Sequence, residues 1–80
     1  MATTDSIKQG IEAGLACEQV EVIGDGQHFQ AVIVSREFAG KSRVQRHQLV
    51  YAALGERMRE EIHALSMQTL TPEEAQSAGG

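Results

Sequence analysis

Three histidines are the side chains of this sequence best suited to bind a metal or to move a proton: His28, His47 and His63. Imidazole titrates near neutral pH and is a common metal ligand. His63 stands where a helical pattern ends and a strand pattern begins, so its side chain would be exposed to a ligand while both elements hold its backbone. From the residues alone, a surface histidine without a role remains the better-supported interpretation.

For each of the other candidate residues, a purely structural role is at least as well supported as a functional one. His28 follows the turn Gly24-Asp25-Gly26, where a loop side chain could swing toward His63, but a polar residue at a strand start is equally well supported. His47 lies on an apolar helical row, which favours a hydrogen-bonded core histidine over a metal ligand. Cys17 is the single cysteine, so it cannot form an internal disulfide, and we interpret it as a small buried apolar residue.

Basic side chains gather in one short stretch of an acidic chain. The net charge is −4, and residues 1–35 carry all of it. Four basic residues in the following stretch are opposed by Glu37 alone: Arg36, Lys41, Arg43 and Arg46. Such a local basic face could bind nucleic acid or an acidic partner surface, and a solvated helix face is the alternative. The Gly-x-x-Gly loop that holds nucleic acid in KH domains is absent from the sequence, which disfavours general RNA binding.

The stretch from 42 to 62 has helical periodicity. Its predicted buried row is Val44, His47, Tyr51, Leu54 and Met58, with Val50 and Ile62 beside it. Arg43 and Arg46 fall off this row, so we expect their charges to stay in water. Ser42 is the predicted N-cap. Gly55 costs about 1 kcal/mol relative to alanine inside a helix, so one kinked helix and two helices meeting near 53–55 both remain open.

The remaining elements predict an α+β fold. Residues 4–15 read as a helix with Ile7, Ile11 and Leu15 on one stripe and with Thr4 or Asp5 as its cap. Residues 18–23 and 29–34 read as a hairpin, and residues 64–70 as a third strand. The thirty-residue helical connection before that strand suits a crossover between parallel strands.

The predicted architecture is therefore a small three-stranded mixed sheet with helices packed on one face, in the order α-β-β-α-(α)-β-α. A last helix should begin at Thr71-Pro72-Glu73-Glu74, with Thr71 as cap and Glu74 completing a capping box.

Length and composition bound the class of protein. The 80 residues form one domain, with 4–74 ordered and 75–80 expected to be a frayed tail. The first residues lack the basic and apolar regions of a secretion signal, so a reduced, cytoplasmic protein is expected. No apolar run is long enough to cross a membrane, and no nucleophile, phosphate loop or paired-cysteine motif of an enzyme is present.

Several motifs, taken together and in order, resemble the BolA family and its short bacterial YrbA/IbaG-like branch. They are GDGQHF at 24–29, VIVS at 32–35, FAGKSRVQRHQLVY at 38–51, IHALS at 62–66 and TLTPEE at 69–74. One departure is the tryptophan that the family often places after the last motif. This chain has Ala75-Gln76-Ser77 there, so we expect a weakly anchored last helix.

The resemblance implies a fold shared with type II KH domains and a role in iron–sulfur metabolism. It implies a heterodimer with a monothiol, CGFS-type glutaredoxin, bridged by a [2Fe–2S] cluster. His63, and His28 as the candidate second ligand, would bind one iron, while the glutaredoxin cysteine and glutathione bind the other. A KH-like regulator that binds nucleic acid through Arg36, Lys41, Arg43 and Arg46 is the alternative, and self-dimerisation is left open.

Overall fold

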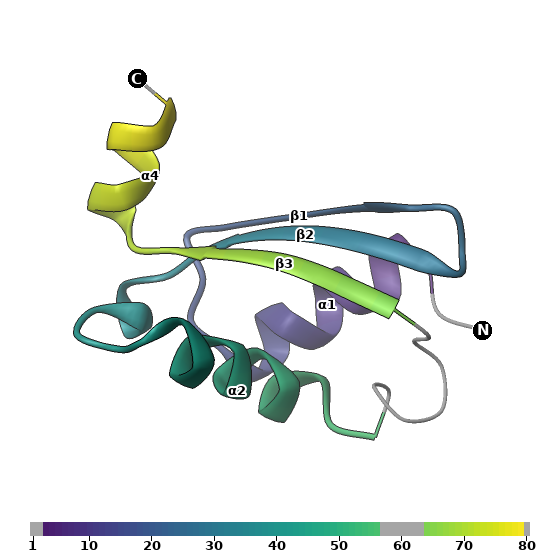
Figure 1. Ribbon diagram of the computed structural model, residues 1–80. Helices are drawn as coiled ribbons and strands as arrows, with labels where there is room; N and C mark the ends of the chain where they lie inside the picture. The colour runs from purple at the N-terminus through teal and green to yellow at the C-terminus, as the bar shows by residue number, and fades with distance from the viewer. Residues whose placement is uncertain (1–2, 57–63, 80) are drawn as a thin grey trace.

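The computed structural model describes residues 3–56 and 64–79 and shows three helices, a 3-10 turn and one three-stranded sheet (Figure 1). The elements in chain order are α1 (Thr4–Gly14), β1 (Gln19–Gly24), β2 (His28–Val34), the 3-10 turn (Arg36–Phe38), α2 (Arg43–Leu54), β3 (Ala64–Leu70) and α4 (Pro72–Gly79). The predicted α+β class and order of elements are confirmed for this part of the chain. The optional additional helix, Met58 and Ile62 fall in 57–63, outside the described residues.

Helix α1 begins at Thr4, as the sequence pattern indicated, but its cap lies one residue before the two predicted candidates. Thr3 is the cap: its Oγ1 accepts from the N–H of Ser6 at 3.0 Å, and the Oγ of Ser6 accepts from the N–H of Thr3 at 2.9 Å. Ser6 thus serves the role that Glu or Gln usually serves in a capping box. The predicted stripe of Ile7, Ile11 and Leu15 is confirmed as buried.

A hairpin joins β1 and β2, as predicted. The strands pair antiparallel from Gln19–Val34 to Gly24–Phe29. In the turn, the Asp25 carboxylate accepts from the N–H groups of Gln27 and His28, both at 2.9 Å. Gly26 has φ of 99°, a backbone conformation that side chains disfavour, so the glycine is required by the turn itself. These bonds fix where β2 begins.

Strand β3 pairs parallel to β2, from His28–Ala64 to Val34–Leu70, so β2 is the central strand and β3 forms an edge. This confirms the crossover inferred from the length of the connection. The bonding continues past the strand ends, because the N–H of Ser35 donates to the carbonyl oxygen of Leu70 at 2.9 Å.

Helices α1 and α2 pack together on one face of the sheet, and α4 extends beyond the end of β3 (Figure 1). The core lies between this helical layer and the sheet. Its fully buried large side chains are Phe29, Phe38, Ile7, Ile11, Ile33 and Val50. Helix α4 includes residues 75–79 of the predicted tail. Among the described residues, none of the helices has the length and apolar character needed to span a membrane.

Helix α2 buries only part of the row predicted for it: Leu54 of that row and Val50 beside it. Val50 and Leu54 are 0% and 3% exposed, whereas Val44 is 66% and Tyr51 42% exposed. The predicted burial of Leu54 is therefore confirmed, and that of Val44 and Tyr51 is wrong. Periodicity shows that apolar residues share a face, but the angle at which a helix docks decides which of two adjacent apolar rows meets the sheet.

The ends of α2 are defined by local chemistry. Ser42 is its N-cap, as predicted, with its Oγ accepting from the N–H of Gln45 at 3.2 Å. Gly55 closes the helix at a φ of 58° and donates its N–H to the carbonyl of Tyr51 at 2.8 Å. Gly55 thus ends this helix, where the sequence left a kink as one option.

Candidate functional site

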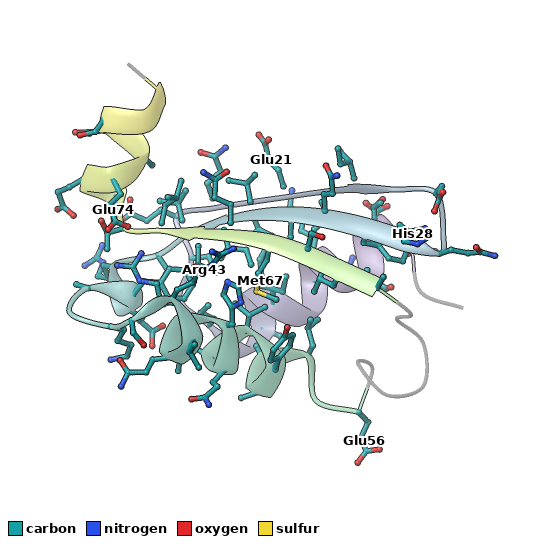
Figure 2. All side chains as sticks on the ribbon, viewed as in Figure 1. Glu21, His28, Arg43, Glu56, Met67 and Glu74 are labelled. Atoms are coloured by element: carbon teal, nitrogen blue, oxygen red, sulfur yellow. The ribbon has the colours of Figure 1, made fainter. Side chains whose placement is uncertain are left out.

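His28 is the first residue of β2 and is exposed at one end of the sheet (Figure 2). Its backbone is held by the Asp25 carboxylate, and the hydrogen bonds from the N–H groups of His28 and then Gln27 lower the pKa of Asp25. Its register partner on β3 is Ala64, the residue that follows His63 in the sequence. The other predicted ligand, His63, lies outside the described residues.

The described residues at this end of the sheet do not form a closed metal site. Within 3–56 and 64–79, there is no cluster of three or more His, Cys, Asp or Glu side chains that could hold a metal ion. His28 offers an exposed imidazole on a fixed backbone, and His63 would bring the histidine donors to two.

An open groove of about 980 Å³ lies between α2, β3 and α4, away from His28. Its basic and imidazole-bearing lining residues are Lys41, Arg43, Arg46 and His47. Glu73 and Glu74 of α4 line the same groove, and Met67 and Leu70 of β3 add apolar surface. The groove therefore has mixed charge, with its basic groups coming from the start of α2.

Arg46 is a structural residue at the centre of this groove. Its guanidinium binds the Glu74 carboxylate in a bidentate pair, with Nη1–Oε1 at 2.6 Å and Nη2–Oε2 at 3.2 Å. It also donates to the carbonyls of Thr69 and Lys41, each at 3.0 Å. The guanidinium stacks 5.9 Å from the ring centre of Phe38.

With its side chain only 14% exposed, Arg46 contradicts the expectation that its charge stays in water. The contacts join α2 to β3 and α4. The groups that sequence reasoning missed here are Glu74, treated only as a capping residue, and the Thr69 carbonyl. No sequence signal could pair Arg46 with a residue 28 positions away.

Glu74 satisfies two demands at once. The predicted capping box is confirmed: the N–H of Thr71 donates to Glu74 Oε1 at 2.9 Å, and the N–H of Glu74 donates to Thr71 Oγ1 at 3.2 Å. The hydrogen bond from Arg46, followed by that from Thr71, lowers the pKa of Glu74 to about 2. The carboxylate that caps α4 thus also ties α4 to α2 through Arg46.

The other predicted basic residues divide between two places. Lys41 and Arg43 are exposed and line the groove beside Arg46. Arg36 does not join them: it lies on the 3-10 turn, is 80% exposed and meets Glu18 at 3.5 Å. The structure therefore groups three of the four basic residues, of which two have free surface to offer a ligand.

His47 and Cys17 are the remaining candidates. His47 is half-buried, lines the groove and meets the Tyr51 ring edge-on, with ring centres 6.5 Å apart. It is not the fully buried core histidine that was expected. Cys17 packs against the core, and burial, with smaller effects from Glu12 and Glu37, raises the pKa of its thiol to about 11. Such a thiol is almost fully protonated at neutral pH and is a poor nucleophile or metal ligand.

The fold and the site can now be compared with known proteins. A family model described as BolA-like protein matches residues 6–74. The chain belongs to the BolA family. This confirms the resemblance drawn from the motifs, which run from 24 to 74.

Two BolA relatives carry functional names. The chain is 39% identical over 71 residues to the acid stress protein IbaG of Escherichia coli, covering 88% of this chain and 84% of that protein. It is 47% identical over 51 residues to the DNA-binding transcriptional regulator BolA of Haemophilus influenzae. That match covers 64% of this chain and only half of the Haemophilus protein.

A solved BolA structure supports the architecture. The BolA protein homologue from Coxiella burnetii has a TM-score of 0.86 and 49% sequence identity to this chain, with 95% of this chain and 99% of that one covered. The three helices and the three-stranded mixed sheet are therefore those of a BolA protein. The likeness to type II KH domains stays a prediction.

Proposed function

We propose that this BolA protein is an iron–sulfur adaptor that works as a heterodimer with a monothiol glutaredoxin. In this proposal, His63 and His28 bind one iron of a bridging [2Fe–2S] cluster. The glutaredoxin cysteine and glutathione bind the other iron. The cluster is cargo or signal rather than a catalytic centre, and a reducing compartment such as the cytoplasm would keep the thiol ligands available.

The observation that carries the proposal is the register of the parallel strands. His28 pairs with Ala64, so the residue after His63 in the sequence sits directly beside the other candidate ligand. The two histidines are 35 positions apart in the chain, and the register brings the residue after His63 beside His28. His28 is also exposed, as a ligand to a cluster shared with a second protein must be.

Histidine ligands would give such a cluster particular chemistry. Imidazole is neutral where thiolate is negative, and this substitution raises the reduction potential, as in Rieske centres. A histidine must also lose its proton to bind iron, so ligation weakens in acid. Both properties suit a cluster that is passed on or sensed rather than stored.

The test is reconstitution of the heterodimer. We would mix the protein with a monothiol glutaredoxin, glutathione, iron and sulfide, and record visible absorption and circular dichroism beside the glutaredoxin alone. His63→Ala should abolish the spectrum of the heterodimer, because one iron loses a ligand, and His28→Ala should shift it. Binding of the two proteins without iron, followed by calorimetry, would separate loss of the cluster from loss of the complex.

His47→Ala is the matched control, since His47 lies in the groove and not at the His28 end of the sheet. It should leave the spectrum unchanged. A wild-type spectrum in a folded His63→Ala variant would overturn the adaptor proposal. If only His28→Ala were silent, the second ligand would have to come from another residue.

A second candidate is nucleic-acid binding through the groove. It is favoured by Lys41 and Arg43, which are exposed at the start of α2, and by the name of the Haemophilus relative. Arg46 would contribute little, because its guanidinium is already bound to Glu74. The net charge of −4 weighs against this candidate and places it second.

A further inference from the structure

Strand β3 is an edge strand that has none of the usual protection against pairing. It reads ALSMQTL, with no charged residue, no proline and no glycine. Natural edge strands are commonly protected by charges, prolines or bulges. The opposite edge strand, β1, carries Glu21 at its centre. Within the described residues, β3 pairs with β2 alone, and on its outer side the Thr69 carbonyl already accepts a hydrogen bond from the Arg46 side chain.

The direction of the backbone groups shows which residues offer hydrogen bonds at this edge. The carbonyl of Leu70 accepts from Ser35 and so points toward β2. The carbonyl of Thr69 accepts from the Arg46 side chain and so points outward. Because these directions alternate along a strand, Met67 and Leu65 also point their N–H and C=O groups outward.

An apolar strip of α2 flanks the same edge. Val44 and Tyr51, which the sequence pattern marks for burial, are 66% and 42% exposed, and half-buried His47 lies between them on the helix. His47 and Met67 line one groove, so the strip and the strand edge are neighbouring parts of one surface. A partner that covered both would bury the side chains that the monomer leaves exposed.

We propose that this surface binds a second copy of the chain, with two β3 strands paired antiparallel about a twofold axis at Met67. In that register, Met67 faces its own copy and Leu65 faces Thr69 of the other copy. The outward backbone groups of Met67 then form the two central hydrogen bonds. The two three-stranded sheets become one continuous six-stranded sheet.

Charge favours a second copy over an unrelated peptide. Antiparallel β3 strands set the two α2 helices antiparallel, so Lys41 and Arg43 at the start of one helix approach Glu56 at the end of the other. The uncharged β3 strands place no like charges opposite each other. His28 is on the central strand and outside the groove, so the dimer does not depend on the proposed cluster.

The test measures association by analytical ultracentrifugation over concentrations from low micromolar to near millimolar. Wild-type protein should show a concentration-dependent dimer. Met67→Pro should weaken it about tenfold or more, because proline removes the outward N–H that each copy donates, while the ladder to β2 stays intact. Met67→Ala, which keeps the N–H, is the matched control and should still dimerise.

Cysteine cross-linking tests the register independently of the proline variant. In the proposed dimer, Ser66 and Gln68 are non-hydrogen-bonded partners with Cα atoms about 4.5 Å apart, within reach of a disulfide. Ser66→Cys/Gln68→Cys in a Cys17→Ala background should therefore form covalent dimers on mild oxidation. The same spacing on the other edge, Gln19→Cys/Glu21→Cys, should not.

Three results would overturn the proposal. One is a wild-type protein that stays monomeric throughout, which would leave the edge to a different protein such as the glutaredoxin. Another is a folded Met67→Pro variant that dimerises as tightly as the wild type. The third is equal cross-linking of the β1 and β3 cysteine pairs. This result would exclude specific pairing through β3 even if Met67→Pro failed to fold.

Discussion

At the scale of single residues, the Arg46–Glu74 pair joins three elements. A bidentate arginine–carboxylate pair is directional and stronger than an ordinary surface ion pair. Here the carboxylate also caps α4, and the guanidinium also binds two backbone carbonyls. Removing either partner leaves the other without its counter-charge and frees the start of α4.

This pair predicts an acid-dependent loss of stability. Arg46 holds the pKa of Glu74 at about 2, below its ordinary value of 4.5. A lowered folded-state pKa stabilises the protein fully above the unfolded value, and this contribution is lost as pH falls from about 4.5 to about 2. Glu74→Gln should therefore be less stable than wild type at neutral pH. The difference in the free energy of unfolding should disappear as the pH approaches about 2. Urea unfolding at several pH values measures it.

Glu73→Gln is the control for this prediction, because Glu73 is next in the chain and its carboxylate is not in the ion pair. It should leave the pH dependence of unfolding unchanged. Parallel unfolding curves for Glu74→Gln and wild type across this pH window would contradict the assigned role of the pair.

At the scale of elements, the packing of α1 on α2 depends on a missing side chain. A Cβ added to Gly14, the last residue of α1, would lie 2.8 Å from both the Cα and the Cβ of Ala53 on α2. Real Cβ atoms do not approach backbone this closely, so the helices would have to move apart. Gly14 weakens the helix by propensity, but it allows the two helices to touch.

Gly14→Ala is thus predicted to destabilise the protein. An alanine usually stabilises a helix by about 1 kcal/mol relative to glycine. Here the collision with Ala53 should reverse the sign and lower the free energy of unfolding by roughly 1–3 kcal/mol. Chemical denaturation of the single variant measures this change.

The double variant Gly14→Ala/Ala53→Gly is the matched control for the collision. It removes the Cβ of Ala53 and leaves the Cα, so it relieves part of the collision, and its loss of stability should be smaller than the sum of the two single losses. Strictly additive losses would show that the Cβ of Ala53 takes no part in the collision.

At the scale of the whole molecule, charge is distributed unevenly over the surface. Residues 1–35 carry the whole net charge of −4, while Lys41 and Arg43 stand exposed at the groove. An acidic protein repels nucleic acid overall, so any binding must use this local basic surface and must weaken as salt rises.

Nucleic-acid binding therefore has a specific test. If the groove binds DNA, Lys41→Glu/Arg43→Glu should lower affinity at low salt by about tenfold or more and reduce the salt slope by roughly two. Fluorescence anisotropy with a labelled duplex measures both. Arg36→Glu is the control, because Arg36 lies on the 3-10 turn, outside the groove, and should have little effect. Equal effects of both variants would indicate non-specific attraction.

Much of this fold could be predicted because its signals are local. Each of these signals depends on residues close in sequence: the alternation of apolar and polar residues in β1 and β3, the run of β-branched residues in β2, and the helix caps at Ser42 and Thr71. The parallel pairing of β2 and β3 followed from the length of the connection. The fold class and the order of elements were therefore determined by the sequence alone.

Tertiary structure decided what depends on how those elements dock. The docking angle of α2 buried Leu54 of the predicted row and Val50 beside it, and left Val44 and Tyr51 of the same row exposed. Docking also turned Arg46 from a predicted surface charge into the anchor of α4. Local sequence fixes where each element begins and which faces are apolar; contacts between residues distant in the chain form only when the elements pack, so packing alone assigned these roles.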